Sequence, residues 1–142
     1  IKKGRKAVNN FTENKLKTMG GIKINDGAGL SKYSKINSKS FNKVLIYLYK
    51  KHFALSKQFL VDVSKHKEYK NLNLPENIKV YVKSGTLAQI GVNNLAGFIE
   101  NTKKNNIFSF TILTKSKEKK LNPVYKGTHT IPILNEIINT YF

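Results

Sequence analysis

The residues best suited to chemistry form one tetrapeptide, Lys83-Ser84-Gly85-Thr86, at the end of a strand that the alternation of residues 78–83 predicts. A lysine there projects its ammonium group from the edge of a sheet, and Gly85 lets a ligand backbone approach because it carries no Cβ. Thr86 adds a hydroxyl and a backbone N–H. The four residues therefore suit a ligand that ends in a carboxylate. Taken alone, the tetrapeptide is more typical of a hairpin turn that begins with a solvated lysine, because it is common by chance.

Two longer stretches give this tetrapeptide a context. The sequence K-S-G-T-L over 83–87, followed by V-N-N-L-A-G-F-I over 92–99, resembles the K-T-G strand and the next strand of penicillin-binding serine D-alanyl-D-alanine carboxypeptidases. Those of low-molecular-mass class C match best. The sequence N-D-G-A-G-L-S over 25–31 resembles the D-G-S-G-L-S loop of the same group. The resemblance extends from about Ala7 to Phe142.

This resemblance implies an α+β fold in which helices flank an antiparallel sheet, the C-terminal part of a penicillin-binding, β-lactamase-like transpeptidase fold. Residues 1–142 are expected to be a single domain or a fragment of one. The implied activity is that of a serine D-alanyl-D-alanine carboxypeptidase or endopeptidase, which acts on peptidoglycan stem peptides ending in D-Ala-D-Ala through an acyl-enzyme. The implied ligands are stem peptides and β-lactams, without metal or cofactor. The implied location is the periplasm or cell envelope of a bacterium.

The resemblance also implies roles for individual residues. Ser31 would be the second-motif serine, which relays a proton toward the leaving amine. Lys83 would support that relay and attract the terminal carboxylate. The backbone N–H of Thr86 would be one oxyanion donor and its hydroxyl a carboxylate contact, with Ser84 and Gly85 completing the substrate-binding strand.

The sequence departs from the family pattern after Ser31. Family members follow the loop serine with an asparagine, whereas this chain reads Ser31-Lys32-Tyr33-Ser34. Ser34 could replace the missing amide, or Asn37 could reach in from the following residues. Ala28 and Ser84 stand where the family has serine and threonine.

The nucleophile is the largest gap. The S-x-x-K pattern occurs at Ser40 to Lys43, at 64–67 and at 116–119. Only Ser40 lies at a predicted helix start, but it follows the second motif instead of preceding it. We therefore expect Ser40 and Lys43 in an exposed first turn, and the true serine and lysine on an upstream segment of the same protein. The first residue, Ile1, is not a methionine, which favours a fragment.

The composition permits a globular domain with a strongly basic surface. The chain has 26 Lys+Arg against 8 Asp+Glu, a formal charge of +18, and 39% hydrophobic residues. Phosphate binding is one interpretation of this charge, but only Arg5 is an arginine and the lysines are scattered, which argues against nucleic acid. A basic surface would equally attract anionic cell-envelope polymers. There are no cysteines, and His52, His66 and His129 lack metal-type spacing.

The elements that must position these residues follow from periodicity and turn signals. Three strands joined by short turns predict an antiparallel meander, with helices before and after it. The predicted helices are 7 to about 19, 39 to about 52 with Ser38 as N-cap, a shorter one within 53–63, and 131–142; the predicted strands are 78–83, 92–100 and 107–115; the predicted loops are 25–37, 64–77 and the turn 102–106, with a solvated charge run at 115–120.

Two other functions are compatible with the sequence. A noncatalytic remnant of the same fold would hold cell-wall peptides without cleaving them, which the missing nucleophile and the residues after Ser31 favour. A basic nucleic-acid-binding module is the third reading, and steep salt dependence of its affinity would identify it.

Overall fold

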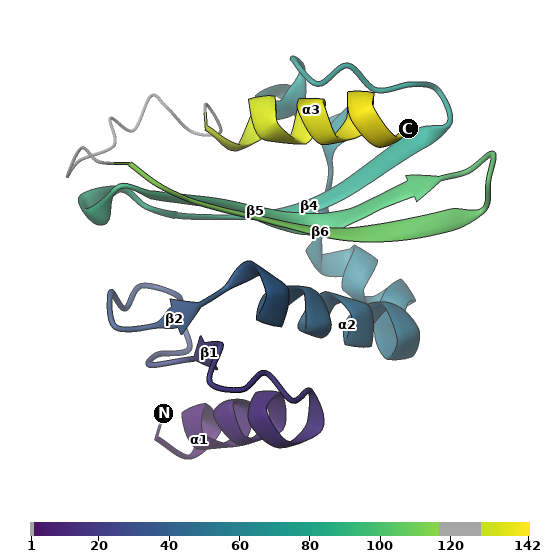
Figure 1. Ribbon diagram of the computed structural model, residues 1–142. Coiled ribbons are helices and arrows are strands. Elements are labelled where there is room, and N and C mark those ends of the chain that lie inside the picture. Colours follow the sequence, from purple (N-terminus) through teal and green to yellow (C-terminus); the bar gives the residue numbers. More distant parts are fainter. Residues whose placement is uncertain (1, 117–128) are drawn as a thin grey trace.

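The structure of the chain, a computed structural model, describes residues 2–116 and 129–142. Figure 1 shows its elements stacked in layers, with α3 on one face of a four-stranded sheet, α2 on the other face with β1 and β2 beside it, and α1 beyond them. The helices are α1 (Lys2–Asn10), α2 (Ser38–Phe59) and α3 (Thr130–Tyr141), and the strands are β1 (Ile22–Lys23), β2 (Lys35–Ile36), β3 (Val61–Asp62), β4 (Ile78–Leu87), β5 (Val92–Asn101) and β6 (Asn106–Lys115).

The large sheet is antiparallel throughout, in the order β3-β4-β5-β6. Strands β4 and β5 pair over their whole length, from Ile78 opposite Asn101 to Leu87 opposite Val92. The predicted meander and the α+β class are therefore confirmed. Strand β4 is longer than the predicted strand 78–83, because its pairing with β5 continues beyond Lys83 to Leu87.

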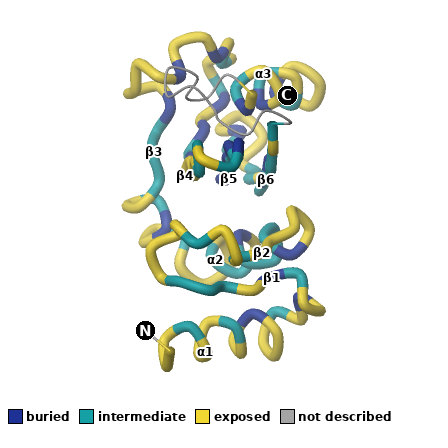
Figure 2. The backbone as a smooth tube through the Cα atoms, turned by 90° about the vertical axis from the view of Figure 1, so that its left-hand side faces the viewer, coloured by how far each residue is buried: buried dark blue, intermediate teal, exposed yellow. Residues whose placement is uncertain are grey.

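Alternation along the strands gives the sheet two different faces. On the face toward α2, the described residues form a smaller buried cluster of Leu45, Ala96 and Phe98, with partly buried Phe41, Phe53, Leu60 and Ile107 packed against it. Figure 2 shows burial concentrated in the sheet and α3, whereas α1 is largely exposed. The larger core lies on the face toward α3 and consists of Val63, Tyr69, Leu72, Ile78, Val80, Val82, Leu95, Ile99, Phe110, Ile112, Leu134 and Ile138.

The N-terminal helix differs from the prediction of residues 7 to 19. It begins at Lys2 and passes after Asn10 into a π-helical turn, Phe11–Lys15. The backbone then leaves the helix because Lys17 and Met19 adopt left-handed conformations, with φ of 53° and 52°. The large apolar residues of this region do not form a core, since Val8, Phe11 and Met19 are 47%, 39% and 87% exposed.

The second helix is longer than predicted. Asn37, not Ser38, is its N-cap, and the helix continues to Phe59 through a kink at His52. The prediction of a shorter helix within 53–63 is confirmed in part, since residues 53–59 are helical after the kink at His52, but this helix ends at Phe59 and not at Val63. Its second half turns extended at Leu60, so that β3 can pair with β4.

The predicted loops contain short regular pieces. Strand β2 lies within 25–37 and pairs with β1, and two 3₁₀ turns, Val63–Lys65 and Lys67–Tyr69, interrupt 64–77. The predicted charge run at 115–120 lies outside the described residues from position 117 onward.

The closing helix α3 packs on the sheet as predicted. Leu134 and Ile138 are 0% and 1% exposed, whereas Tyr141 is 73% exposed, so the buried stripe is narrower than the sequence pattern suggested. Across the described residues, no helix combines the length and apolar character needed to cross a membrane.

Candidate active site

The K-S-G-T tetrapeptide lies on a strand edge. Strand β3 pairs with β4 only at Tyr81 and Val82, so from Lys83 onward this side of β4 has no strand partner among the described residues. The sequence placed the tetrapeptide at a strand end, but β4 continues through it to Leu87. A Cβ built on Gly85 would have no heavy atom within 4 Å. The edge is therefore open to a ligand backbone.

The loop that carries Ser31 is fixed by its own side chains. The Asp26 carboxylate accepts a hydrogen bond from the Leu30 N–H at 2.9 Å, and the Ser34 hydroxyl accepts one from the Asn25 N–H at 3.1 Å. The Ser34 N–H in turn donates to the Ser31 carbonyl at 3.2 Å. Ser34 therefore holds the loop in shape.

The Ser31 hydroxyl is oriented by two donors. The Asn25 side-chain amide donates to Ser31 Oγ at 2.9 Å, and the Tyr33 N–H donates to the same oxygen at 3.2 Å. Arg5 donates to the Asn25 side-chain oxygen at 3.1 Å and to its carbonyl at 3.2 Å. Because both lone pairs of Ser31 Oγ accept, its proton is directed to a further acceptor.

Asn25 and Arg5 were missed by the sequence analysis as contributors to the site. The available signal was indirect. The family's asparagine after the loop serine is absent here, while Asn25 begins the same motif-bearing stretch. The Asn25 amide reaches the Ser31 hydroxyl, six positions later, because of the loop conformation. Residue types alone do not specify that conformation.

The Ser31 loop and the end of β4 line one cavity of about 660 Å³. It brings Ser31 and Thr86 together, as their predicted roles require. An adjoining hollow of about 700 Å³ shares Ser31, Lys32, Leu87 and Ile90 with it, so the two form one groove. The residues that line the first cavity are Leu30, Ser31, Lys32, Tyr33, Thr86, Leu87, Ala88, Gln89 and Ile90.

Lys83 does not line this groove. Its ammonium donates to the Ser84 carbonyl at 2.9 Å, and its side chain is exposed. Because side chains alternate along a strand, Lys83 and Thr86 start from opposite faces of β4. Lys83 lies on the open edge of β4, three residues before Thr86, which lines the groove.

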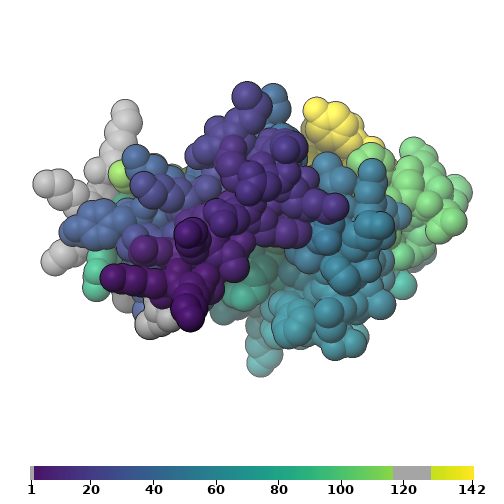
Figure 3. All heavy atoms as spheres, turned by 90° about the horizontal axis from the view of Figure 1, so that it is seen from below, coloured from purple at the N-terminus to yellow at the C-terminus, as the bar shows by residue number. Residues whose placement is uncertain are grey.

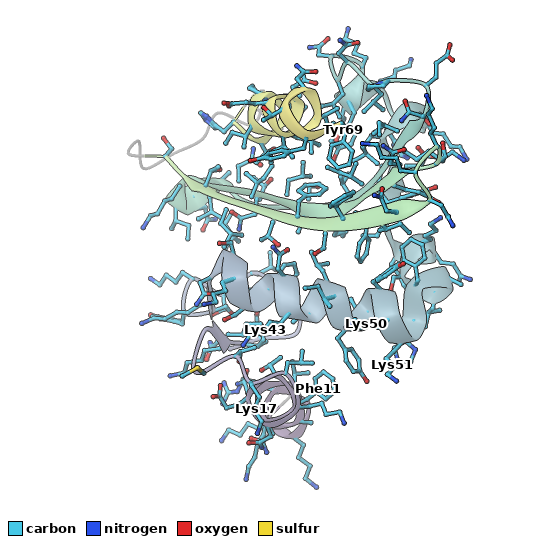
Figure 4. The ribbon with its side chains drawn as sticks, turned by 45° about the vertical axis from the view of Figure 1, so that its right-hand side comes forward. Phe11, Lys17, Lys43, Lys50, Lys51 and Tyr69 are labelled. Atoms are coloured by element: carbon cyan, nitrogen blue, oxygen red, sulfur yellow. The ribbon has the colours of Figure 1, made fainter. Side chains whose placement is uncertain are left out.

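Ser84 and Thr86 face α3, where they line a smaller cavity of about 260 Å³ with Tyr69. Figure 4 shows Tyr69 between the sheet and α3. Burial raises the pKa of the Tyr69 hydroxyl above 10.0, the negative charge of Glu68 raises it further, and a hydrogen bond with Ser84 partly offsets both. Thr86 lines both cavities and so connects them.

Asn37, Ser40 and Lys43 have structural partners away from the groove. The Asn37 side chain accepts from the Ser40 N–H at 2.8 Å. The Ser40 hydroxyl donates to the Thr18 carbonyl at 3.2 Å, and Lys43 donates to the Lys17 carbonyl. Ser40 does lie in the first helical turn, but the expectation that it is exposed is wrong, since it is 4% exposed.

Metal ligands are not clustered in the part of the chain that the structure describes. Within it, no three His, Asp or Glu side chains are grouped to hold an ion.

The α+β fold, a helix-flanked antiparallel sheet whose open edge meets a serine-bearing loop, is compatible with a C-terminal fragment of a peptidase fold. A family model, D-Ala-D-Ala carboxypeptidase 3 (S13) family, matches residues 1–125, and the chain belongs to that family. Membership supports a carboxypeptidase, a hydrolase acting on peptidoglycan peptides. Searches of curated proteins and of solved structures found no match.

Proposed function

We propose that this chain completes the active site of a serine-type D-Ala-D-Ala carboxypeptidase, which cleaves stem peptides through an acyl-enzyme in the bacterial envelope and is inhibited by β-lactams. One observation carries the proposal. Ser31 and Thr86, which belong to two motifs distant in sequence, line the same cavity beside the open edge of β4.

The open edge supplies the means to hold a peptide. An extended peptide adds to such an edge through main-chain hydrogen bonds, and Gly85 leaves room for it. The terminal carboxylate would then meet the Thr86 hydroxyl and the Lys83 ammonium. Among the described residues, the Lys83 ammonium donates to the neutral Ser84 carbonyl, and a carboxylate would be the stronger acceptor because both partners are charged.

The Ser31 network supplies the proton step. With Asn25 and the Tyr33 N–H occupying the acceptor side of Ser31 Oγ, the hydroxyl proton is available for the leaving amine. Asn25 provides beside Ser31 the amide that the family carries after its loop serine. The Thr86 N–H would be one donor to the oxyanion.

We place the nucleophilic serine and its lysine on a segment upstream of Ile1. Ser40 is buried and donates to a backbone carbonyl, and Ser64 donates to the Asp62 carboxylate at 2.7 Å. Neither lines the groove. In the third S-x-x-K sequence, at 116–119, the lysine lies outside the described residues.

The test is intact-mass spectrometry after incubation with a penicillin, performed on this chain and on a version extended upstream. We expect a covalent adduct on the extended chain only. In that version, Ser31→Ala should slow acylation by about 10²-fold, since general acid–base groups contribute about that much or more. Thr86→Ala should have a milder effect because its backbone N–H remains. Ser64→Ala, which alters a serine remote from the groove, is the matched control and should acylate at the parental rate.

Each other outcome is informative. An adduct on the short chain would locate the nucleophile within these residues and contradict the upstream placement. A folded extended chain that never acylates, but still binds a D-Ala-D-Ala peptide, would instead identify a noncatalytic peptide-binding remnant.

A further inference from the structure

Half of the 26 Lys and Arg of this chain lie in one layer. Residues 2–51, which form α1, β1, β2 and most of α2, contain 13 Lys and Arg against 2 acidic residues. On the α3 side of the sheet, the described residues 63–77 and 129–142 together contain three lysines and three acids, so their charges balance. A compositional bias alone would spread lysines over both sides of the sheet. The asymmetry therefore marks one face of the molecule, seen from below in Figure 3.

The charges of this layer are not neutralised internally. Two ion pairs are found among the described residues, Lys57 with Glu100 and Lys65 with Asp62. Neither pair involves a residue of 2–51. The two acids of the layer are engaged with neutral groups. Glu13 accepts from the Thr18 hydroxyl at 3.2 Å and the Gly20 N–H at 2.8 Å, and Asp26 accepts from Leu30.

The cations form a row along α2. Lys39, Lys43 and Lys50 are spaced four and seven residues apart and so lie on one side of the helix. The Lys43 ammonium donates to the Lys17 carbonyl, which brings the loop after α1 alongside this row. Figure 4 shows the labelled Lys17, Lys43, Lys50 and Lys51 on the side of α2 that faces α1.

We propose that this basic face binds a flexible, base-free phosphodiester polymer, such as a polyol phosphate chain of a cell envelope. A row of lysines supplies point charges that suit repeated single negative charges without demanding fixed geometry. Reading nucleic acid bases favours arginine forks and open aromatic rings. The one arginine, Arg5, is bonded to Asn25. Phe11 and Tyr49 pack edge-on against Tyr47 and Phe53, with ring centres 5.3 Å and 5.1 Å apart. The most exposed ring of the layer, Tyr33, belongs to the Ser31 loop and not to the row of lysines on α2.

This proposal is independent of the catalytic one. Its test measures binding of a fluorescent glycerol phosphate oligomer to the full chain over a series of salt concentrations. A triple variant, Lys39→Gln with Lys50→Gln and Lys51→Gln, removes three exposed charges from the face and spares Lys43. Each lost phosphate contact should reduce the slope of log affinity against log salt by about 0.7. The slope of the triple variant should therefore be smaller by roughly 2, and its affinity should be at least ~10-fold weaker.

The matched control removes the same charge from the sheet side: Lys79→Gln with Lys103→Gln and Lys104→Gln, all exposed. It should retain most of the affinity and slope. Equal losses in both triple variants would show attraction by net charge alone and overturn the proposal. So would the absence of saturable binding. Tighter binding of a single-stranded oligonucleotide with the same number of phosphates would overturn it in favour of nucleic acid.

Discussion

The two faces of the sheet differ in how much apolar side-chain surface they bury. Toward α3, a continuous apolar core includes side chains that are 0–1% exposed, such as Val80, Leu134 and Ile138. Toward α2, three buried residues form the core, and large apolar side chains such as Leu55 and Phe59 remain 51% and 70% exposed. The sheet and α3 are therefore stabilised mainly by burial of apolar side chains, whereas the α1–α2 layer depends more on polar contacts. The candidate site lies where the two regions meet.

The largest expected effect comes from Gly97, in the middle of β5. A Cβ at this position would lie 1.9 Å from the Tyr81 carbonyl oxygen and 3.0 Å from Val82 Cα, both backbone atoms of β4. Gly97→Ala must therefore push β4 and β5 apart inside the better-packed region. We expect a loss of roughly 3 kcal/mol or more in the free energy of unfolding, measured by urea denaturation.

Gly85→Ala is the control for this prediction. It lies on β4 with nothing within 4 Å of its Cβ position. Its unfolding free energy should change by less than about 1 kcal/mol, although acylation of the extended chain should suffer because the new methyl group obstructs the strand edge. Comparable destabilisation by the two substitutions would mean that β4 and β5 are not packed as described.

The second prediction compares two leucines, one from each region. Leu134→Ala leaves a cavity at a fully buried position between α3 and the sheet, and should lower the unfolding free energy by about 2–5 kcal/mol. Leu55→Ala truncates a half-exposed side chain on α2 and should cost about 1 kcal/mol or less. Equal costs in urea denaturation would show that the α2 side is buried in solution, for example by self-association, and that the comparison of the two regions does not hold.

The better-packed region is also the one that the sequence predicted well. Alternating apolar residues at 78–83 specified β4, because period-two burial leaves few other arrangements. Strands β5 and β6 were also predicted within one or two residues, although β5 is buried without alternation from Leu95 to Ile99. Helix α3 followed from its stripe, since Leu134 and Ile138 fill the core between α3 and the sheet. The fold brings Ser31 and Thr86, which the family motifs singled out, to one cavity, and their catalytic roles stay predictions.

The α1–α2 layer was predicted less well, for a physical reason. Where little apolar surface is buried, boundaries are decided by local hydrogen bonds and backbone angles. The left-handed Lys17 and Met19 end the first helical region, and the Asn37 cap begins α2 one residue before the expected start. The contact of Asn25 with Ser31 belongs to the same class, because one loop conformation determines it.

The third prediction tests the polar contacts of this layer. Asn37 caps α2 by accepting from the Ser40 N–H at 2.8 Å. Asn37→Ala should cost about 1 kcal/mol of unfolding free energy, as the loss of an N-cap generally does. Asn10→Ala is the matched control, since Asn10 precedes the π-helical turn without a side-chain cap bond. A neutral Asn37→Ala would show that α2 does not need its cap and that the layer is held in another way.

The smallest expected effect concerns the ion pair that joins α2 to the sheet. The Lys57 ammonium lies 3.1 Å from the Glu100 carboxylate and 4.5 Å from the centre of the Tyr81 ring. Burial tends to lower the pKa of Lys57, but the hydrogen bond and charge of Glu100, with Tyr81, raise it overall above 10.5. The folded state therefore holds this proton more tightly than the unfolded state does. The stability that this ion pair contributes is fully present below pH 10.5, the ordinary pKa of lysine. It is lost as the pH rises through the higher pKa of the folded state.

Lys57→Met should flatten this alkaline loss while keeping the apolar stem of the side chain. The measurement is the unfolding free energy in urea at pH about 8 and about 11, compared between parent and variant. Lys79→Met is the control, because exposed Lys79 has no ion pair among the described residues and its removal should leave the decline unchanged. An equally steep decline in Lys57→Met would mean that the pair contributes nothing to joining the two regions, leaving the β3–β4 pairing and the small α2-side core to hold the layer on the sheet.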